Sequence, residues 1–148
     1  MLSTSLHTGS TWLGSELGDA SKWTVSLSAE QISELLATSE AIARRKVEWQ
    51  NVSRLDYDLP RWQSTILQLR EVLEGGIGFA RIRALPVEHI SPELARTMLW
   101  GIGQHLGYPE SQDAAGNLLH DVKDTGKDLD TDNIRAYQTN LGINYHND

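Results

Sequence analysis

Three stretches of the sequence repeat apolar residues at the spacing of an α-helix. A capping box that begins at Ser28 precedes the first stretch, which predicts a helix over residues 29–46. Pro60, whose fixed φ suits a first turn, starts the second, which runs to a pair of glycines at 75–76. A third helix is predicted over 91–107. The apolar positions expected to face a core are Ile32, Leu35, Leu36, Ile42, Ala43, Trp62, Ile66, Leu69, Leu73, Leu94, Met98, Ile102 and Leu106.

The other regular segments are short and resemble strands. "GFARIR", residues 78–83, is bounded by glycine and proline, and two more strands are predicted near 117–122 and 134–140, joined by a polar linker. From Leu141 onward apolar and polar residues alternate strictly, which predicts a last strand. Helices therefore come first and strands late. This order indicates an α+β fold, or the helical beginning of a β fold.

Residues 1–22 are rich in serine, threonine and glycine and predict an irregular N-terminal arm. Trp12, Leu13, Leu17 and Trp23 are the side chains expected to hold this arm on the body of the protein. The arm has neither the basic start nor the apolar centre of a secretory signal, and no apolar stretch reaches the roughly 20 residues that span a bilayer. We expect a cytoplasmic protein without a membrane partner. The lack of arginine in the first residues disfavours the alternative, a mitochondrial location.

Composition narrows the classes of function. The chain has 148 residues, enough for one ordinary domain, and a formal net charge of −7, which argues against a nucleic-acid partner because phosphate binding needs a basic surface. It has no cysteine, which excludes disulfides, thiolate metal sites and cysteine nucleophiles. Nothing in the pattern specifies an oligomeric state.

Several other motifs favour structural explanations. "KDLDTDN", residues 127–133, has aspartates at alternate positions but lacks the glycine and glutamate of a calcium loop, so a solvated linker is the better interpretation. His89 and His105 are isolated and are interpreted as surface or capping residues. If 117–122 is a strand, His120 and Asp121 point to opposite faces and cannot share a ligand. The glycines at 101, 103 and 107 are expected to allow close packing of the third helix or to end it.

The polar face of the last predicted strand carries a histidine and an aspartate two residues apart. Asn144, His146 and Asp148 share this face. On an extended backbone such residues project from one side roughly 7 Å apart, so the imidazole and the carboxylate can converge on one ion. They would form two ligands of a 2-His-1-carboxylate facial triad, a set that leaves iron(II) open positions. The alternative, from the pattern alone, is the polar outer face of an edge strand.

Four segments together resemble the taurine dioxygenase-like (TauD/TfdA) family of iron(II)/2-oxoglutarate-dependent oxygenases. "RAYQTNLGINYHND" is similar to the region of the first two iron ligands, and "GFARIRALP" to the strand-and-turn entry. "GIGQHLGYP" resembles the helix that ends in a Gly-x-Pro turn, and "TWLGSELGDASKW" an N-terminal segment of some members. The resemblance covers most of the chain in scattered blocks, and it is carried by their order and spacing. It implies that His146 and Asp148 bind iron(II) and that Asn144 points into the same cavity, toward substrate or the surroundings of the metal.

The resemblance also implies a fold: helices that lead into a double-stranded β-helix (jelly roll, clavaminate synthase-like), here incomplete. The family's third metal ligand, a histidine, and its arginine for 2-oxoglutarate are missing from this sequence. We therefore expect residues 23–148 to be the N-terminal portion of such a domain, truncated at the first metal-binding motif and inactive alone. The residues that bind 2-oxoglutarate are expected downstream. A truncated gene product is the other explanation.

The complete enzyme would hydroxylate a small organic substrate, with iron(II) as cofactor, 2-oxoglutarate as co-substrate and molecular oxygen. No catalytic residue is expected apart from the metal ligands, and the sequence does not select the substrate. Gln138 and Asn140 are further residues that could reach the pocket. The competing hypothesis is a non-catalytic helical interaction domain whose exposed C-terminal strand pairs with a partner.

Overall fold

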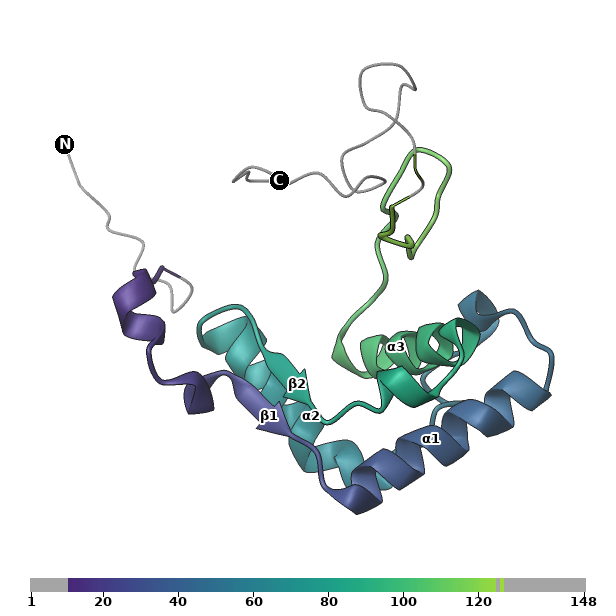
Figure 1. Ribbon diagram of the computed structural model, residues 1–148, viewed down its shortest axis with the longest axis horizontal. Coiled ribbons are helices and arrows are strands. Elements are labelled where there is room, and N and C mark those ends of the chain that lie inside the picture. The colour runs from purple at the N-terminus through teal and green to yellow at the C-terminus, as the bar shows by residue number, and fades with distance from the viewer. Residues whose placement is uncertain (1–10, 125, 127–148) are drawn as a thin grey trace. The chain divides into compact units, whose positions relative to one another are not determined.

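The computed structural model describes residues 11–124 and 126 (Figure 1). These residues belong to two units, with the boundary after Pro109. The described helices and strands all lie in the first unit, which is a mixture of helices and strands. None of these helices is long and apolar enough to cross a membrane.

The first helix, α1, spans Ala29–Arg44 and agrees with the prediction for 29–46. It begins at the predicted capping box: the Ser28 hydroxyl accepts from the Gln31 amide at 3.3 Å, and the Gln31 side chain accepts from the Ser28 amide at 3.0 Å. Leu35, Ser39 and Ile42 are its buried residues, whereas the prediction that Ala43 faces the core was wrong, because Ala43 is exposed. Because they follow at intervals of four and three, they form one stripe that faces the core.

The second predicted helix is present but has three parts. A 3-10 turn, η4, spans Pro60–Trp62, the helix α2 spans Gln63–Arg70, and a π-helical turn, η5, spans Glu71–Gly75. Leu73 is 37% exposed, so its prediction as a core residue was wrong. It lies in the π-helical turn, where residues no longer follow the 3.6-residue spacing on which the prediction rested.

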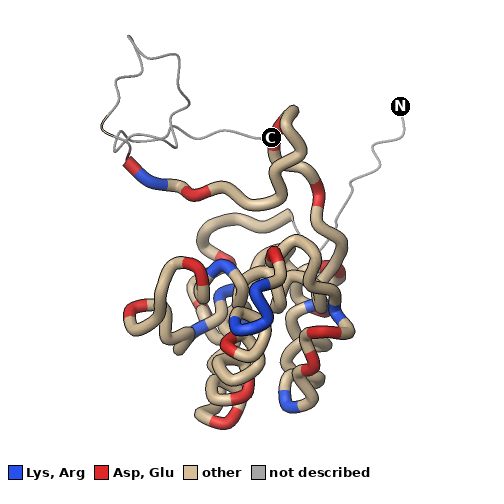
Figure 2. The backbone as a smooth tube through the Cα atoms, turned by 90° about the vertical axis from the view of Figure 1, so that its right-hand side faces the viewer, with Lys and Arg blue, Asp and Glu red and all other residues tan. Residues whose placement is uncertain are grey.

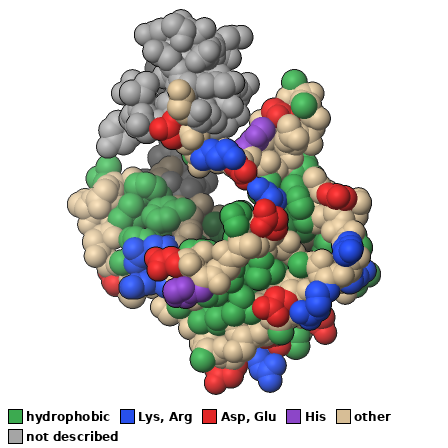
Figure 3. Space-filling view, turned by 45° about the vertical axis from the view of Figure 1, so that its right-hand side comes forward, with side chains coloured by type: hydrophobic (Ala, Val, Ile, Leu, Met, Phe, Trp, Pro, Cys, Tyr) green, Lys and Arg blue, Asp and Glu red, His purple; other side chains and the backbone are tan. Residues whose placement is uncertain are grey.

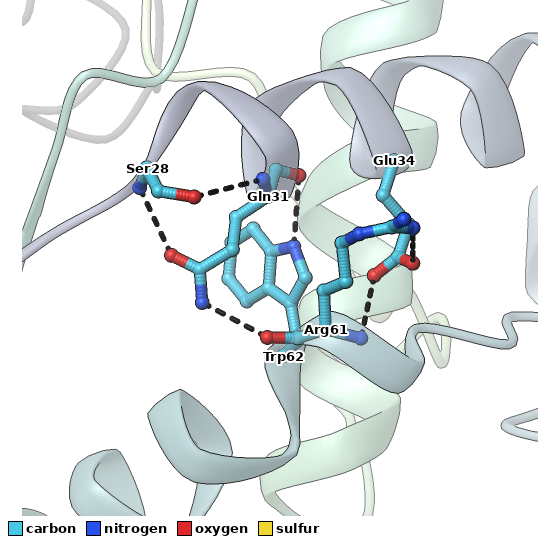
Figure 4. A network of polar contacts seen from close by, with 5 residues as sticks. All are labelled: Ser28, Gln31, Glu34, Arg61 and Trp62. Carbon is cyan, nitrogen blue, oxygen red and sulfur yellow. Dashed lines mark hydrogen bonds and ion pairs between the residues drawn. The ribbon is translucent and has the colours of Figure 1, made fainter.

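The start of α1 is fastened to η4 by polar contacts (Figure 4). The Trp62 indole donates to the Gln31 carbonyl at 2.9 Å, and the Gln31 side-chain amide donates to the Arg61 carbonyl at 3.1 Å. The Arg61 amide and guanidinium both donate to the Glu34 carboxylate, at 2.9 and 3.1 Å. The residue that caps α1 therefore also sets the angle at which the next helix leaves.

The third helix, α3, spans Pro92–Leu106 and packs against α1 and α2. The Ser91 hydroxyl caps it by accepting from the Leu94 amide at 3.2 Å. Its buried residues include Met98 and Trp100, and the Trp100 indole donates to the Val52 carbonyl at 2.8 Å. The α3 stripe therefore joins the loop after α1 to the core.

The sheet in the described residues has two parallel strands. β1, Thr24–Ser26, pairs with β2, Arg81–Arg83, so that Val25 lies opposite Ile82. The strand predicted over 78–83 is confirmed for its last three residues, and β1 was not predicted. The mixture of helix and strand agrees with the α+β prediction. The double-stranded β-helix stays a prediction, because these two strands are all that the described part of the chain contains.

Aromatic side chains hold the described part of the N-terminal arm against β2 and the residues that lead into it. Trp12 donates from its indole to the Ile77 carbonyl at 2.9 Å and meets the Phe79 ring edge-on at 5.4 Å between ring centroids. Trp23 contacts the same ring at 5.4 Å, and the Arg81 guanidinium lies over Trp23 at 4.8 Å. Trp12 and Trp23 therefore anchor the arm as expected, whereas the prediction for Leu13 was wrong, because it is 70% exposed. The arm contains two short 3-10 turns, η1 (Gly14–Leu17) and η2 (Ala20–Lys22).

The strand predicted over 117–122 is wrong: residues 117–122 form no strand in the structure. The Asn117 amide donates to the Asp113 carboxylate at 3.0 Å, and the Asn117 carbonyl accepts from the Gln112 amide at 2.7 Å. The backbone amide and carbonyl of Asn117 therefore form hydrogen bonds within a local turn and are not available for pairing with another strand. The predicted strands over 134–140 and 141–148 and the linker over 127–133 lie outside the described residues.

We expect Gln31→Ala to lower the free energy of unfolding by about 2 kcal/mol. The substitution removes hydrogen bonds to Ser28, to the Arg61 carbonyl and to the Thr65 hydroxyl, the last at 2.8 Å, and a hydrogen bond contributes about 1 kcal/mol. The control is Gln68→Ala on the exposed side of α2, expected to change stability by less than about 0.5 kcal/mol. Urea unfolding measures both. Equal effects would contradict the role given to Gln31.

We expect Gly101→Ala to destabilise the protein by about 1–3 kcal/mol, because a methyl group at Gly101 would overlap the Tyr57 ring. The matched control is Gly103→Ala in the same helix, where the added methyl meets nothing within 4 Å. The control should raise stability by up to about 1 kcal/mol through helix propensity alone. Thermal unfolding of both variants separates the steric effect from propensity, and a stabilised Gly101→Ala would contradict this packing.

Candidate functional site

The predicted metal ligands lie beyond the part of the chain that the structure describes. His146, Asp148 and Asn144 are outside the described residues, as are Gln138 and Asn140. The expected convergence of the imidazole and the carboxylate stays a prediction. Within residues 11–124 and 126, no group of three or more histidine, aspartate or glutamate side chains is arranged to hold a metal ion.

A groove of about 650 Å³ lies in the first unit. Its walls come from the loop between η3 (Trp49–Asn51) and η4, from α2, and from the last turn of α3. The lining mixes apolar side chains with a few polar and charged ones, as small-molecule sites do. The lining residues are Arg54, Leu55, Tyr57, Asp58, Leu59, Gln63, Ile66, Leu67, Arg70 and His105.

Tyr57 forms the floor between the groove and the core. The residue is fully buried, and its ring lies directly beneath Gly101 of α3. Its hydroxyl is hydrogen-bonded to the Ser39 hydroxyl of α1, which donates its own proton to the Leu35 carbonyl at 2.6 Å. Because the single proton of Ser39 is used in this way, Tyr57 must be the donor. Burial raises the pKa of the Tyr57 hydroxyl to about 12.

The loop that carries Tyr57 is held by the neighbouring Asp56. Its carboxylate accepts from the Ser53 amide at 3.0 Å and hydroxyl at 2.7 Å, and from the Arg45 guanidinium at 2.9 Å. The hydrogen bonds from Ser53, followed by the contact with Arg45, lower the pKa of the Asp56 carboxyl to about 2. The carboxylate therefore stays charged at neutral pH and keeps the loop closed over the core.

His105 and Arg70 connect two walls of the groove. The His105 Nε2 lies 2.7 Å from the Tyr57 carbonyl, and because a carbonyl oxygen only accepts, Nε2 carries the proton. The Arg70 Nε donates to the His105 carbonyl at 3.1 Å. His105 is thus a half-buried bridge between α3 and the Tyr57 loop, not the surface or capping residue that was expected. His89 is exposed, in agreement with its prediction.

In the second unit, Asp113 organises a turn. Its carboxylate accepts from the Asn117 amide and side chain, at 3.0 and 2.6 Å, and lies 3.2 Å from the His120 Nε2. The hydrogen bonds from Asn117 hold the pKa of the Asp113 carboxyl below its usual value. His120 therefore contacts Asp113. The expectation that His120 and Asp121 point to opposite faces rested on a strand that these residues do not form.

The groove was not predicted from the sequence, although two signals were present. Gly101 interrupts the apolar stripe of the third helix, and a glycine within a helix indicates the close approach of a bulky neighbour. "RLDYDLP", residues 54–60, places a tyrosine between charged residues in a short connection. Neither signal tells which distant residues converge there, because Arg70 and His105 come from different helices.

The chain is similar to a known enzyme over most of its length. It is 31% identical over 140 residues to FR-33289 synthase from Streptomyces rubellomurinus (strain ATCC 31215). The aligned region is 94% of this chain and 41% of the synthase, so the chain spans less than half the length of this curated relative. No family model matches the chain. The chain is thus similar to part of an enzyme.

We expect Tyr57→Phe to lower stability at pH 7 by about 1 kcal/mol and to change its dependence on alkaline pH. The pKa of Tyr57 is about 10 in the unfolded chain and about 12 in the folded one. The stability that the neutral hydroxyl contributes is therefore complete below about pH 10 and is lost as the pH rises to about 12. The difference between wild type and variant should shrink over this interval.

Urea unfolding at several pH values between neutral and alkaline measures this difference. The control is Tyr108→Phe, because Tyr108 is 96% exposed and its replacement should leave both the stability and its pH dependence unchanged. A difference between wild type and Tyr57→Phe that stays constant through the alkaline range would contradict the burial of a neutral Tyr57 hydroxyl.

Proposed function

We propose that this chain is the N-terminal portion of an iron(II)/2-oxoglutarate-dependent oxygenase. The observation that carries the proposal is the 31% identity to FR-33289 synthase over 94% of the chain. That alignment takes in 41% of the synthase, as a portion of a longer enzyme would. The mixture of helices and parallel strands in the first unit also agrees with helices that precede a β fold.

Within this proposal, His146 and Asp148 are two of the three protein ligands of the metal. An imidazole nitrogen and a carboxylate oxygen are the donors of the 2-His-1-carboxylate set, which suits iron(II). A second histidine and an arginine that binds the carboxylate of 2-oxoglutarate would be supplied by a longer chain. Bound iron, with 2-oxoglutarate and oxygen, supplies the oxidation that hydroxylates a C–H bond of a small organic substrate.

The residues of this chain would bind and orient. His146 must bind the metal through a neutral nitrogen, so its other ring nitrogen donates a proton to an acceptor that fixes the ring. Asp148 contributes negative charge that partly neutralises the cation. Asn144, on the same polar face of the predicted strand, would hydrogen-bond substrate or a group beside the metal ligands.

A second hypothesis is a non-catalytic interaction domain. Apolar side chains exposed on the first unit favour it, and Figure 3 shows such side chains reaching the surface between charged ones. Val87 is 56% exposed, Leu99 58% and Tyr108 96%. Exposed apolar residues of this kind mark a partner surface where they form a continuous patch. Iron binding distinguishes the two hypotheses.

The test uses the protein translated from the complete reading frame that contains this sequence. Anaerobic addition of iron(II) and then 2-oxoglutarate should produce a visible charge-transfer absorption band. His146→Ala and Asp148→Ala should each remove the band, because each substitution takes away one of the three protein ligands of the metal. His89→Ala is the matched control, because His89 is an exposed histidine of the helical unit, and it should keep the band.

Two outcomes would reject the oxygenase. The first is a reading frame without a downstream histidine and arginine. The second is a band that survives in both His146→Ala and Asp148→Ala. An unchanged spectrum in the wild-type protein would favour the interaction domain.

A further inference from the structure

The groove beside Tyr57 has the size and lining of a small-molecule site. Its volume, about 650 Å³, lies within the range of about 300–1,000 Å³ that is usual for such sites. Leu55 and Leu67 line it and are 93% and 68% exposed, so both offer apolar surface that the described protein does not cover. Leu59 and Ile66 line it as buried residues. A ligand can therefore gain contact area on two sides of the groove.

Arg70 brings a positive charge into this apolar surrounding. The residue is half-buried, and its Nε donates to the His105 carbonyl at 3.1 Å, which fixes the plane of the guanidinium. Three other arginines of the unit are paired with carboxylates: Arg44 with Glu40, Arg45 with Asp56 and Arg61 with Glu34. Arg70 has no carboxylate within 4.0 Å among the described residues.

The charges that line the groove favour an anion. Arg54 also lines it and, within the described part of the chain, likewise has no acidic side chain within ion-pair distance. Asp58 is the one carboxylate in the lining, so the two guanidinium groups outnumber it. The whole chain has a net charge of −7, and along the backbone acidic and basic residues are interspersed (Figure 2). A groove in which basic groups outnumber acidic ones therefore stands out from its surroundings.

We propose that the groove binds a small organic anion whose charged head contacts Arg70 and whose apolar body lies on Leu55 and Leu67. A half-buried guanidinium without a carboxylate gains most from an anionic partner, because a planar acid accepts two of its N–H groups at once. Since one hydrogen bond already orients Arg70, little conformational freedom is lost on binding. Arg54 adds a second positive charge at the exposed side. All residues involved belong to the first unit, so the inference does not depend on the proposed function.

The test uses the full chain at low ionic strength with two probes, 4-phenylbutyrate and phenylphosphonate, and a neutral control, 4-phenylbutyramide. Titration followed by ¹H–¹⁵N NMR should show saturable shifts at residues 54–70 and at His105. The amide should bind at least about tenfold more weakly, a difference of about 1.4 kcal/mol. A preference for one probe identifies whether the site takes carboxylates or phosphonates.

Three variants test which arginine contacts the charged group of the probe. Arg70→Met keeps most of the aliphatic stem and should weaken binding of the charged probes about tenfold. Arg54→Met, which breaks no hydrogen bond in the described structure, tests the groove even if Arg70→Met unfolds. It should weaken binding about threefold, a loss of about 0.7 kcal/mol. The control is Arg44→Met, because Arg44 lies at the end of α1 and does not line the groove. This variant should bind the charged probes as the wild type does.

Two results would overturn the proposal. Equal binding of the acid and the amide, unchanged by both Arg70→Met and Arg54→Met, would mean that the groove binds apolar groups without selecting an anion. The second result is that the charged probes cause no saturable shifts at concentrations up to about 10 mM. Their binding free energy would then be smaller than about 3 kcal/mol, and the groove would not be a specific site for small organic anions.

Discussion

The packing of the Tyr57 ring beneath Gly101 is the contact on which the helical unit depends. It brings the loop after α1 against α3, its hydroxyl reaches Ser39 of α1, and its carbonyl accepts from His105 at the end of α3. One residue thus joins two helices through its side chain and backbone together. A side chain at position 101 would push the ring away from Ser39 and leave the serine oxygen without its donor, which is costly in a buried place.

The groove follows from the same contact. Tyr57 is its floor, and the residues on either side of Tyr57 in sequence form one wall. His105 fixes this wall to α3, and Arg70 is positioned by the carbonyl of His105. The orientation of Arg70 in the groove therefore depends on Gly101 of α3, because only a residue without a side chain leaves room for the Tyr57 ring. A binding surface of this kind is a by-product of core packing that a ligand can use.

The helices could be predicted from the sequence because the signals that define them are local. Ser28 and Gln31 cap α1 within one turn, and Pro60 and Ser91 mark the other two starts. β1 could not, because three residues carry no periodicity and Thr24–Ser26 become a strand only through Arg81–Arg83. The strand predicted over 117–122 failed for the opposite reason: the side chain of Asp113 captures the backbone of Asn117. The metal motif stays a prediction from the sequence pattern, whereas the groove required knowledge of which helices meet.

The parallel pairing of β1 with β2 has a consequence for synthesis of the protein on the ribosome. Val25 emerges long before its partner Ile82, and both α1 and α2 are made in between. The first strand must therefore wait, with Val25 and Leu27 uncovered, until the chain through α1 and α2 has been made and the second strand can pair beside it. Loop-closure entropy opposes that late step less if the intervening helices are already compact. The nascent chain is consequently most open to chaperone capture or misassociation at its N-terminal strand, and this exposure ends only when Arg81–Arg83 leave the exit tunnel.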